Sequence, residues 1–422
     1  MSAKRGMAAH RFVMTPAGSS GDVHPFVGVG RALRSRGHEV VIVAGEPFEQ
    51  VVRQAGLDFR ATHSAEEYDH VTKDPDLWHP RRGLKSVLGY AASMIRVGYE
   101  RVQEAYEPGR TVLVGHPMSF ATRMFEEKHG VPAATLQLAP SVFRSDHLQP
   151  ALAPGLDISS APRWMKRSFW WAIDRLLIDP PLAPALNQFR LELGLPTVAR
   201  VMRNWVHSPR RVIALFPAWF GLPQPDWPAA LRLTGFPLYD ESDQQAIPDG
   251  LQRFLDQGTA PILFTPGSAN RVAAQFFHAA IDACERLGRR GVFLTRYVEH
   301  LPDLPESVHH EPYAPLPLVL PRCAALVHHG GVGTVAQGLA AGVPQLTMPM
   351  GFDQPDNATR LYRLGVGRWV RPSRFRGPTV AAVLRDLLDD PRVAAACARW
   401  SNEIRGYPAV DRTCDLLEEL AV

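Results

Sequence analysis

The chain has 422 residues, of which 45% are hydrophobic and 21% charged, and its formal net charge is +4. This length and composition predict a globular protein of two or three domains and exclude a largely disordered chain. The positive charge comes almost entirely from scattered arginines, so the sequence does not indicate a nucleic-acid-binding face.

The N-terminal residues MSAKRGMAAHRFVM lack the sustained apolar core and the small-residue cleavage site of a signal peptide. No uninterrupted apolar run of about 18 residues indicates a transmembrane helix. The cysteines have no CxxC spacing, so we expect reduced or buried thiols, not disulfides or a zinc site. Together these features predict a cytoplasmic protein.

The first half of the chain predicts a parallel sheet covered by helices. Near-continuous apolar strands alternate with helical patterns, which is typical of a Rossmann-like domain. The predicted strands are 11–15, 38–44, 57–61, 111–115 and 133–138, and the predicted helices include 47–55 and one from near Pro25 to near Gly37.

The loop after the first predicted strand, 16–25, carries Asp22 and His24 at the sheet edge where ligands bind. Its glycines do not have the GxGxxG spacing of a dinucleotide-binding turn, which argues against a Rossmann oxidoreductase. An alternative to a functional role is that Asp22 only caps the helix expected to begin near Pro25, because Asp is a favoured N-cap residue.

Three segments extend beyond what the predicted sheet needs. The polar stretch 62–86 is too long for a plain connection, a helix is predicted over 84–106, and a basic, aromatic helix lies within 161–180. We expect these segments to wall a wide apolar pocket, although any one tryptophan could instead pack under the domain. The residues that would form this wall are Trp78, Leu84, Leu88, Met94, Trp164, Phe169, Trp170 and Trp171.

A proline-rich stretch after Arg211 marks the connection between two domains. We place an N-terminal domain at 1–225, a linker at 226–250, a C-terminal domain at 251–400 and a tail at 401–422. After the linker the α/β pattern restarts, with a strand and turn at 261–268, a helix at 273–287 and a strand at 291–295. The turn places Ser268 within reach of a phosphate.

The segment 308–361 carries the clearest functional pattern. Residues 324–327 predict a strand, the glycine-rich residues 328–334 a turn, and the residues through Ala341 a helix. Glycines let a backbone approach a ligand and a helix N-terminus offers unpaired N–H groups, so this turn suits a diphosphate. Thr334 adds a hydroxyl and His329 a ring N–H. The alternative is a plain tight turn with structural histidines.

A second predicted strand, 345–350, leads to Asp353 and Gln354, whose polar groups suit the hydroxyls of a sugar. Upstream, Tyr313 offers a flat face on which a nucleobase can stack. Base, diphosphate and sugar would thus be bound in order along one segment.

This segment resembles the donor-binding signature of the family 1 glycosyltransferases, inverting enzymes that use nucleotide sugars. The resemblance implies the GT-B fold, in which two Rossmann-like α/β domains face each other across a cleft and a C-terminal tail packs back on the N-terminal domain. It implies no metal and no cofactor other than the nucleotide-sugar co-substrate. The donor-binding residues that it implies are Ser268, Tyr313, Ala314, His329, Gly331, Gly333, Thr334, Gln337, Asp353 and Gln354.

The resemblance also assigns the general base to Asp22, with His24 beside it. The chain departs from the signature at four positions, where Gln, Trp, Asn and a ribose-binding Glu are often found; this chain has Leu316, Val332, Gly333 and Gln337 there. Because Gln337 replaces that Glu, the hydrogen bonds to the ribose hydroxyls would be weaker. This points to a deoxyribose donor such as a dTDP-sugar.

Longer stretches, including AGSSGDVHPFVGVGRALRSRGH and LQRFLDQGTAPILFTPGS, resemble the rhamnosyltransferases of rhamnolipid synthesis. This implies transfer of L-rhamnose from dTDP-L-rhamnose onto a 3-(3-hydroxyalkanoyloxy)alkanoic acid, giving a mono-rhamnolipid. Arg163, Lys166 and Arg167 would meet the acceptor carboxylate or the inner face of the cytoplasmic membrane. Three alternatives stay open: a UDP-glucose or other dTDP-sugar enzyme acting on a sterol, macrolide or polyphenol, a catalytically dead nucleotide-sugar-binding protein, and an oxidoreductase.

Overall fold

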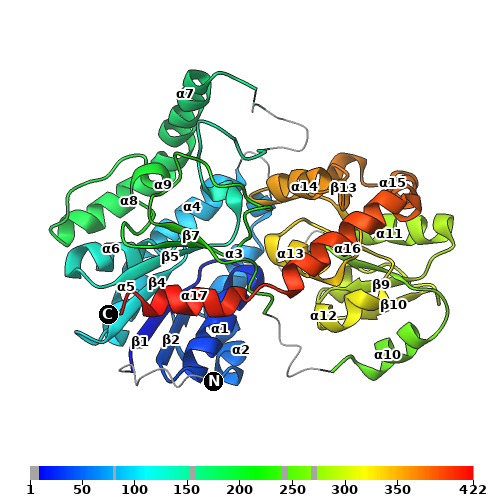
Figure 1. The fold of residues 1–422 in the computed structure, drawn as a ribbon, viewed down its shortest axis with the longest axis horizontal. Helices are drawn as coiled ribbons and strands as arrows, with labels where there is room; N and C mark the ends of the chain where they lie inside the picture. Colours follow the sequence, from blue (N-terminus) through cyan, green and yellow to red (C-terminus); the bar gives the residue numbers. More distant parts are fainter. Residues whose placement is uncertain are drawn as a thin grey trace.

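The computed structural model describes residues 9–78, 82–152, 158, 160–239, 246–267 and 273–421. Within these ranges the chain forms two lobes, each built on a parallel β-sheet with helices on its faces (Figure 1). The structure therefore confirms the predicted α/β fold of two Rossmann-like domains.

The N-terminal sheet has the strand order β3-β2-β1-β4-β5-β6-β7, and all its strand pairs are parallel. Its interior strand β1 sends Phe12 and Met14 to one face and Val13 to the other, because side chains alternate along a strand. The last strand, β7, lies inside the range 226–250 that the sequence assigns to the linker, so the sheet continues past residue 225. The strands are β1 (Arg11–Thr15), β2 (Glu39–Ala44), β3 (Asp58–Ala61), β4 (Thr111–Gly115), β5 (Ala133–Gln137), β6 (Val212–Ala214) and β7 (Leu231–Leu233).

Two sets of helices cover the two faces of this sheet. The first face holds α1 (Ser20–Ser35), α2 (Glu49–Gln54) and α17 (Ala409–Glu418). The second face holds α4 (Gly83–Ser93), α5 (Ile95–Ala105), α6 (Phe120–His129) and α8 (Asp179–Glu192). The N-terminal lobe also contains the short helices α3 (Ala65–Thr72) and α9 (Val201–Asn204).

The C-terminal sheet has the order β10-β9-β8-β11-β12-β13, again with parallel pairs. The strands are β8 (Ile262–Thr265), β9 (Gly291–Leu294), β10 (Val308–Glu311), β11 (Ala325–His328), β12 (Gln345–Thr347) and β13 (Gly367–Trp369). The helices are α10 (Asp249–Asp256), α11 (Ala274–Leu287), α12 (Leu316–Val319), α13 (Val332–Ala341), α14 (Gln354–Arg363), α15 (Gly377–Asp389) and α16 (Pro391–Arg405).

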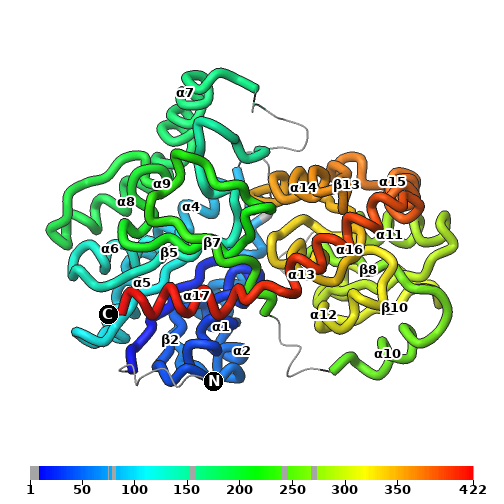
Figure 2. The backbone as a smooth tube through the Cα atoms, in the orientation of Figure 1, coloured from blue at the N-terminus to red at the C-terminus, as the bar shows by residue number. Residues whose placement is uncertain are grey.

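The end of the chain runs from the C-terminal lobe back over the N-terminal lobe, as the red part of the tube in Figure 2 shows. Cys414 and Leu417 of α17 are buried in the core that β1 and α1 form. At the rim of this contact Arg36 makes ion pairs with three carboxylates of the tail, those of Asp411, Asp415 and Glu418. The last helix therefore belongs to the N-terminal core.

Two predicted helices differ from the structure. The predicted helix 84–106 is divided at Met94 into α4 and α5. The basic helix expected within 161–180 is α7 (Arg163–Ile173), which continues through a π-helical turn, Asp174–Ile178, into α8. Figure 1 shows α7 projecting from the N-terminal lobe, away from its sheet.

The cysteines are buried free thiols, as their spacing predicts. Among the described residues, the structure contains no helix that combines the length and the apolar character needed to cross a membrane.

Candidate active site

The carboxyl ends of both sheets meet at one cavity of about 790 Å³. Its walls come from the segments that follow β1 to β7 in the N-terminal domain and β8 to β12 in the C-terminal domain. This is the edge at which open parallel sheets bind ligands. Both domains must therefore contribute to any reaction in this cavity.

Asp22 lines the cavity from the first turn of α1. The helix begins at Ser20, five residues before the predicted start, because Ser19 and Asp22 form a capping box that satisfies its first N–H groups. The Ser19 backbone N–H donates to Asp22 Oδ2 over 2.7 Å, and Ser19 Oγ donates to the same atom over 3.2 Å. Asp22 thus caps the helix and also faces the cavity.

Burial and hydrogen bonding act in opposite directions on the pKa of the Asp22 carboxyl. Removal from water raises the pKa of Asp22 to about 6, against the two hydrogen bonds from Ser19, which lower it. Gly18 has a φ of 133°, and a side chain there would collide with the Asp22 carboxyl. The glycine before the helix is therefore needed to seat this carboxylate.

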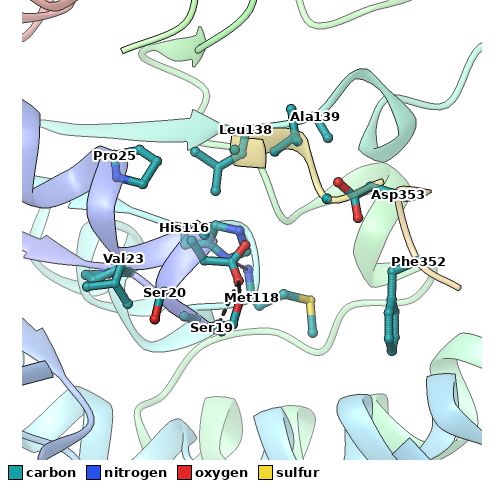
Figure 3. Close-up of a pocket in the computed structure, with 18 of the residues that line it drawn as sticks. Ser19, Ser20, Val23, Pro25, His116, Met118, Leu138, Ala139, Phe352 and Asp353 are labelled. Carbon is teal, nitrogen blue, oxygen red and sulfur yellow. Dashed lines mark hydrogen bonds between the residues drawn. The ribbon is translucent and has the colours of Figure 1, made fainter. Parts of the chain in front are cut away.

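Asp353 lies on the opposite wall, across the cavity from Ser19 and Ser20 (Figure 3). Its Oδ2 accepts a hydrogen bond from Asn357 Nδ2 over 2.8 Å, and its carboxyl also accepts one from the backbone N–H of Val332. Removal from water and the negative charge of Asp22 raise the pKa of Asp353 to about 7. Two acidic groups from different domains thus share one cavity.

Two histidines line the same cavity in their neutral forms. Burial, followed by the positive charge of Arg296, lowers the pKa of His24 to about 4. Burial lowers the pKa of His116 to about 3. His116 and Arg296 were not predicted, although His116 directly follows β4 just as the Asp22 loop follows β1, so the rule for strand ends points to it.

The two histidines of the glycine-rich turn, His328 and His329, have different roles. His328 is completely buried; its Nδ1 accepts from the Gly330 N–H over 3.2 Å, which leaves Nε2 to donate to Gln345 Oε1 at 3.0 Å. His328 is therefore structural. His329 lines the cavity, and within the described part of the chain its buried Nδ1 has no hydrogen-bond partner.

Glycines make room for the His329 ring. A Cβ at Gly267 would lie 2.8 Å from its Cε1, and one at Gly331 would collide with its Nε2. Burial lowers the pKa of His329 to about 4, so the ring is neutral and can donate one N–H. Gly331 is also the N-cap of α13, so the ring lies next to the helix N-terminus.

The other expected donor residues lie as follows. The cavity is lined by Tyr313, Ala314, Gly333, Thr334, Gln337 and Gln354, and Ser268 lies outside the described residues. Gln354 is buried, and its Oε1 accepts from the Met350 N–H over 2.8 Å, which leaves its Nε2 as the group available to a ligand. Phe352, which was not predicted, lines the cavity with a φ of 58°, a conformation that costs a non-glycine residue about 1–2 kcal/mol.

The expected apolar wall is only partly correct. Met94 and Trp170 line the cavity. Trp164 and Trp171 are 69% and 54% exposed, and Phe169 borders a separate hollow beside α7. Trp164 and Trp171 are seven residues apart and so share one helix face, while Trp170 is turned away from them. For Trp164, Phe169 and Trp171 the prediction is therefore wrong; the Trp78 side chain lies outside what the structure describes.

The basic residues of α7 do not reach the cavity either. Lys166 Nζ donates to the His147 carbonyl over 2.7 Å, Arg167 pairs with Asp146 at 2.9 Å, and Arg163 is exposed. The apolar wall is formed mainly by α4 and α5 and by the segment before them. Leu84 and Leu88, which were predicted, lie on this wall, and the members that were not predicted include Leu77, Val87, Ala91, Ile95 and the aromatic residues Tyr68 and Tyr90.

Both lobes match known protein families. Residues 12–145 match the family model of the glycosyltransferase family 28 N-terminal domain, and residues 292–420 match that of the erythromycin biosynthesis protein CIII-like C-terminal domain. The O-mycaminosyltylonolide 6-deoxyallosyltransferase of Streptomyces fradiae is 30% identical over 430 residues, which cover 97% of this chain and 97% of that protein.

Solved structures share the fold. The glycosyltransferase of kitacinnamycin superposes with a TM-score of 0.75 at 21% identity, covering 99% of this chain and 100% of that chain. A spinosyn rhamnosyltransferase complexed with thymidine diphosphate gives a TM-score of 0.67 at 19% identity, covering 97% and 100%. With 30% identity across nearly its whole length to a known transferase, the chain belongs to the family 1 GT-B glycosyltransferases, of the macrolide and antibiotic type.

Proposed function

We propose that this glycosyltransferase moves L-rhamnose from dTDP-L-rhamnose onto a hydroxyl of an apolar acceptor, with inversion at the anomeric carbon. The observation that carries the proposal is the pair of carboxyl groups that the two domains bring to one cavity, Asp22 on the acceptor side and Asp353 on the donor side. One group can remove a proton from the attacking hydroxyl while the other holds the sugar.

Asp22 is suited to act as the general base. Its Oδ2 is held by Ser19, which leaves Oδ1 for the acceptor hydroxyl. A pKa of about 6 leaves most Asp22 side chains ionised above pH 7 and keeps their basicity close to the working pH, where general bases are most effective. As the hydroxyl oxygen attacks C1 of the sugar, its proton passes to Asp22 and the bond to the diphosphate breaks.

The departing diphosphate would be stabilised by the start of α13. The free N–H groups of this helix end, the His329 ring and the Thr334 hydroxyl lie on the cavity wall and suit the developing negative charge. The proposal therefore needs no metal ion. Asp353 and Gln354 would bind sugar hydroxyls, and Tyr313 would stack on the base.

Two observations support a dTDP-sugar. Gln337 stands where a ribose-binding carboxylate is often found in the family, which favours a deoxyribose donor. The similar spinosyn rhamnosyltransferase was solved with thymidine diphosphate, and the Streptomyces fradiae relative is named for a 6-deoxyallosyl group. L-Rhamnose is itself a 6-deoxyhexose.

For the acceptor we propose a 3-(3-hydroxyalkanoyloxy)alkanoic acid, which would give a mono-rhamnolipid. The support is the apolar wall of α4 and α5, with Leu84, Val87, Leu88 and Met94 on the cavity. Each methylene buried there would contribute about 0.8 kcal/mol. A macrolide is the second candidate, because the 30% identical relative is named for a macrolide-type acceptor, O-mycaminosyltylonolide.

The proposal is tested by measuring sugar transfer for each combination of a donor and an acceptor. The purified protein would be incubated with dTDP-L-rhamnose, dTDP-glucose or UDP-glucose and with a hydroxyalkanoyloxyalkanoic acid or a macrolide aglycone, and the products read by mass spectrometry and by NMR of the new anomeric centre. A lipid product of inverted configuration from dTDP-L-rhamnose supports the proposal. Transfer to the macrolide alone selects the second candidate, and transfer only from UDP-glucose contradicts the donor assignment.

A further inference from the structure

Two polar residues, Gln137 and Arg144, lie in the cavity wall at and beyond the end of β5. The reaction proposed above does not use either of them. Gln137 is the last residue of β5, lines the cavity and is completely buried. Its Nε2 lies 3.2 Å from His207 Nδ1, and within the described ranges its Oε1 has no hydrogen-bond partner. A buried carboxamide with one free end costs stability unless a ligand completes it.

Arg144 lines the same cavity, and its positive charge acts on His207, the partner of the Gln137 amide. Its side chain is 8% exposed, its guanidinium lies 4.7 Å from the centre of the Trp170 ring, and one Nη donates to Asp174. Among the described residues this is the only hydrogen bond that Arg144 donates, so several of its five N–H donors stay available. A largely buried arginine with free donors is an oxygen-binding group.

The surroundings hold Arg144 in place. Asp174 is completely buried and also accepts from Arg200 Nε over 3.1 Å. Asp174 begins a π-helical turn, a feature that occurs frequently at functional sites. Arg200 itself has a φ of 52°, which L-residues adopt only at a cost. Local irregularity is thus concentrated around the carboxylate that orients Arg144.

We propose that Arg144 and Gln137 bind a second oxygen of the acceptor, a carboxylate or carbonyl oxygen remote from the hydroxyl that receives the sugar. The inference rests on the proposed function, since it places the acceptor in this cavity. Turning the Gln137 amide over and moving the His207 proton to Nδ1 would present Nε2–H to that oxygen, and both orientations are compatible with one structure.

The sheet sets the distance between the two ends of the acceptor. The strand order places β4 between β1, which precedes Asp22, and β5, which ends at Gln137. Neighbouring strands are about 4.8 Å apart, so the two ends of the acceptor are separated by on the order of 10 Å. An extended chain advances about 3.5 Å for every three bonds, so roughly eight bonds join the reacting hydroxyl to the second oxygen.

Binding, measured apart from turnover, tests the inference. Three matched probes would be titrated by calorimetry in the presence of dTDP: 3-(3-hydroxydecanoyloxy)decanoic acid, its methyl ester, and an analogue that carries hydrogens in place of the terminal carboxyl. A charge-assisted hydrogen bond is worth about tenfold to a hundredfold in affinity, so the acid should bind that much more tightly than the analogue. Arg144→Met and Gln137→Leu should each reduce this preference, and Arg144→Lys should restore part of it.

The two sources of the oxygen give different patterns. If a carboxylate is recognised, the acid binds more tightly than the ester; if a neutral carbonyl is recognised, acid and ester bind alike and both exceed the analogue. Arg163→Met, an exposed arginine outside the cavity, is the matched control and should change none of these ratios. Unchanged dTDP affinity shows that each variant is folded.

The inference is overturned if Arg144→Met weakens all three probes equally, because the arginine would then only support the wall, or if the unaltered protein shows no preference among them. Failure of the proposed function looks different. In that case the acid binds with an Arg144-dependent preference, but no sugar is transferred to it. Transfer without any preference would keep the proposed function and remove the second-oxygen site.

Discussion

The negative charge of Asp22, on the first turn of α1, contributes to raising the pKa of Asp353, which immediately precedes α14 in the other domain. The ionised Asp22 therefore makes Asp353 harder to ionise across the interdomain cavity. The protonation of the group proposed to bind the sugar thus depends on the charge of the proposed base.

The first prediction concerns the pH dependence of turnover. Because the base must be ionised, kcat/KM should rise with pH, with an apparent pKa near 6, that of Asp22. Asp353, with a pKa of about 7, is mostly protonated where Asp22 titrates, so Asp353→Asn should leave the position of this limb nearly unchanged, whatever it does to the maximal rate. A limb that moves by a full pH unit or more in the variant would contradict this order of ionisation.

The second prediction concerns stability. The pKa of Asp22 is raised in the folded state, so its ionisation destabilises the fold as pH rises from about 4 through about 6. Asp22→Asn should therefore be more stable than the unaltered protein at pH 8 by about 2–3 kcal/mol, and the difference should vanish near pH 4. Urea unfolding at both pH values measures it. A variant that is less stable at pH 8 would contradict this assignment of the pKa.

The third prediction concerns Ser19 as a positioning residue. Ser19→Ala removes the Oγ hydrogen bond to Asp22 and weakens the helix cap, which should cost about 1 kcal/mol of stability. Loss of a hydrogen bond that favours the carboxylate should also move the pH limb of kcat/KM upward. Ser19→Thr, which keeps a hydroxyl, should restore both. A variant with lowered stability but an unchanged pH limb would limit Ser19 to capping.

The fourth prediction concerns the donor. His329→Ala should weaken dTDP binding by about tenfold, because it removes a donor to a doubly charged group, and calorimetry measures this directly. The matched control is His328→Asn; since the ring of His328 hydrogen-bonds to the Gly330 N–H and to Gln345 and is not on the cavity wall, this change should lower the melting temperature instead. Equal affinity for dTDP and UDP in the unaltered protein would remove the support that Gln337 gives to a deoxyribose donor.

Local patterns predicted most of the fold because strand and helix periodicity is a property of each segment. The strands β1, β4 and β11 lie within a residue of their predicted positions. The start of α1 was missed because Pro25 was taken as the start of the helix, whereas the capping box at Ser19 sets it. Capping needs only four residues, so this signal was present in the sequence.

The apolar wall was harder to predict because it depends on which face of α7 meets the domain. Composition alone does not distinguish the three tryptophans of α7. Of Trp164, Trp170 and Trp171, only Trp170 lines the cavity. Trp170 contacts residues distant in the chain, because its ring lies against the Arg144 guanidinium and its Nε1 donates to Gln149 Oε1. Arg296 was missed for a related reason: it follows β9 and lies in the cavity near His24 only because the two domains meet there.

The central claim is that Asp22 removes the proton from the acceptor hydroxyl. The most direct test is the turnover of Asp22→Asn with a saturating acceptor, together with its affinity for dTDP. The account predicts that kcat falls by about 10²–10⁴ while dTDP affinity is unchanged, because the substitution alters a proton acceptor on the other side of the cavity from the donor site. Near-normal kcat in the folded variant would contradict it.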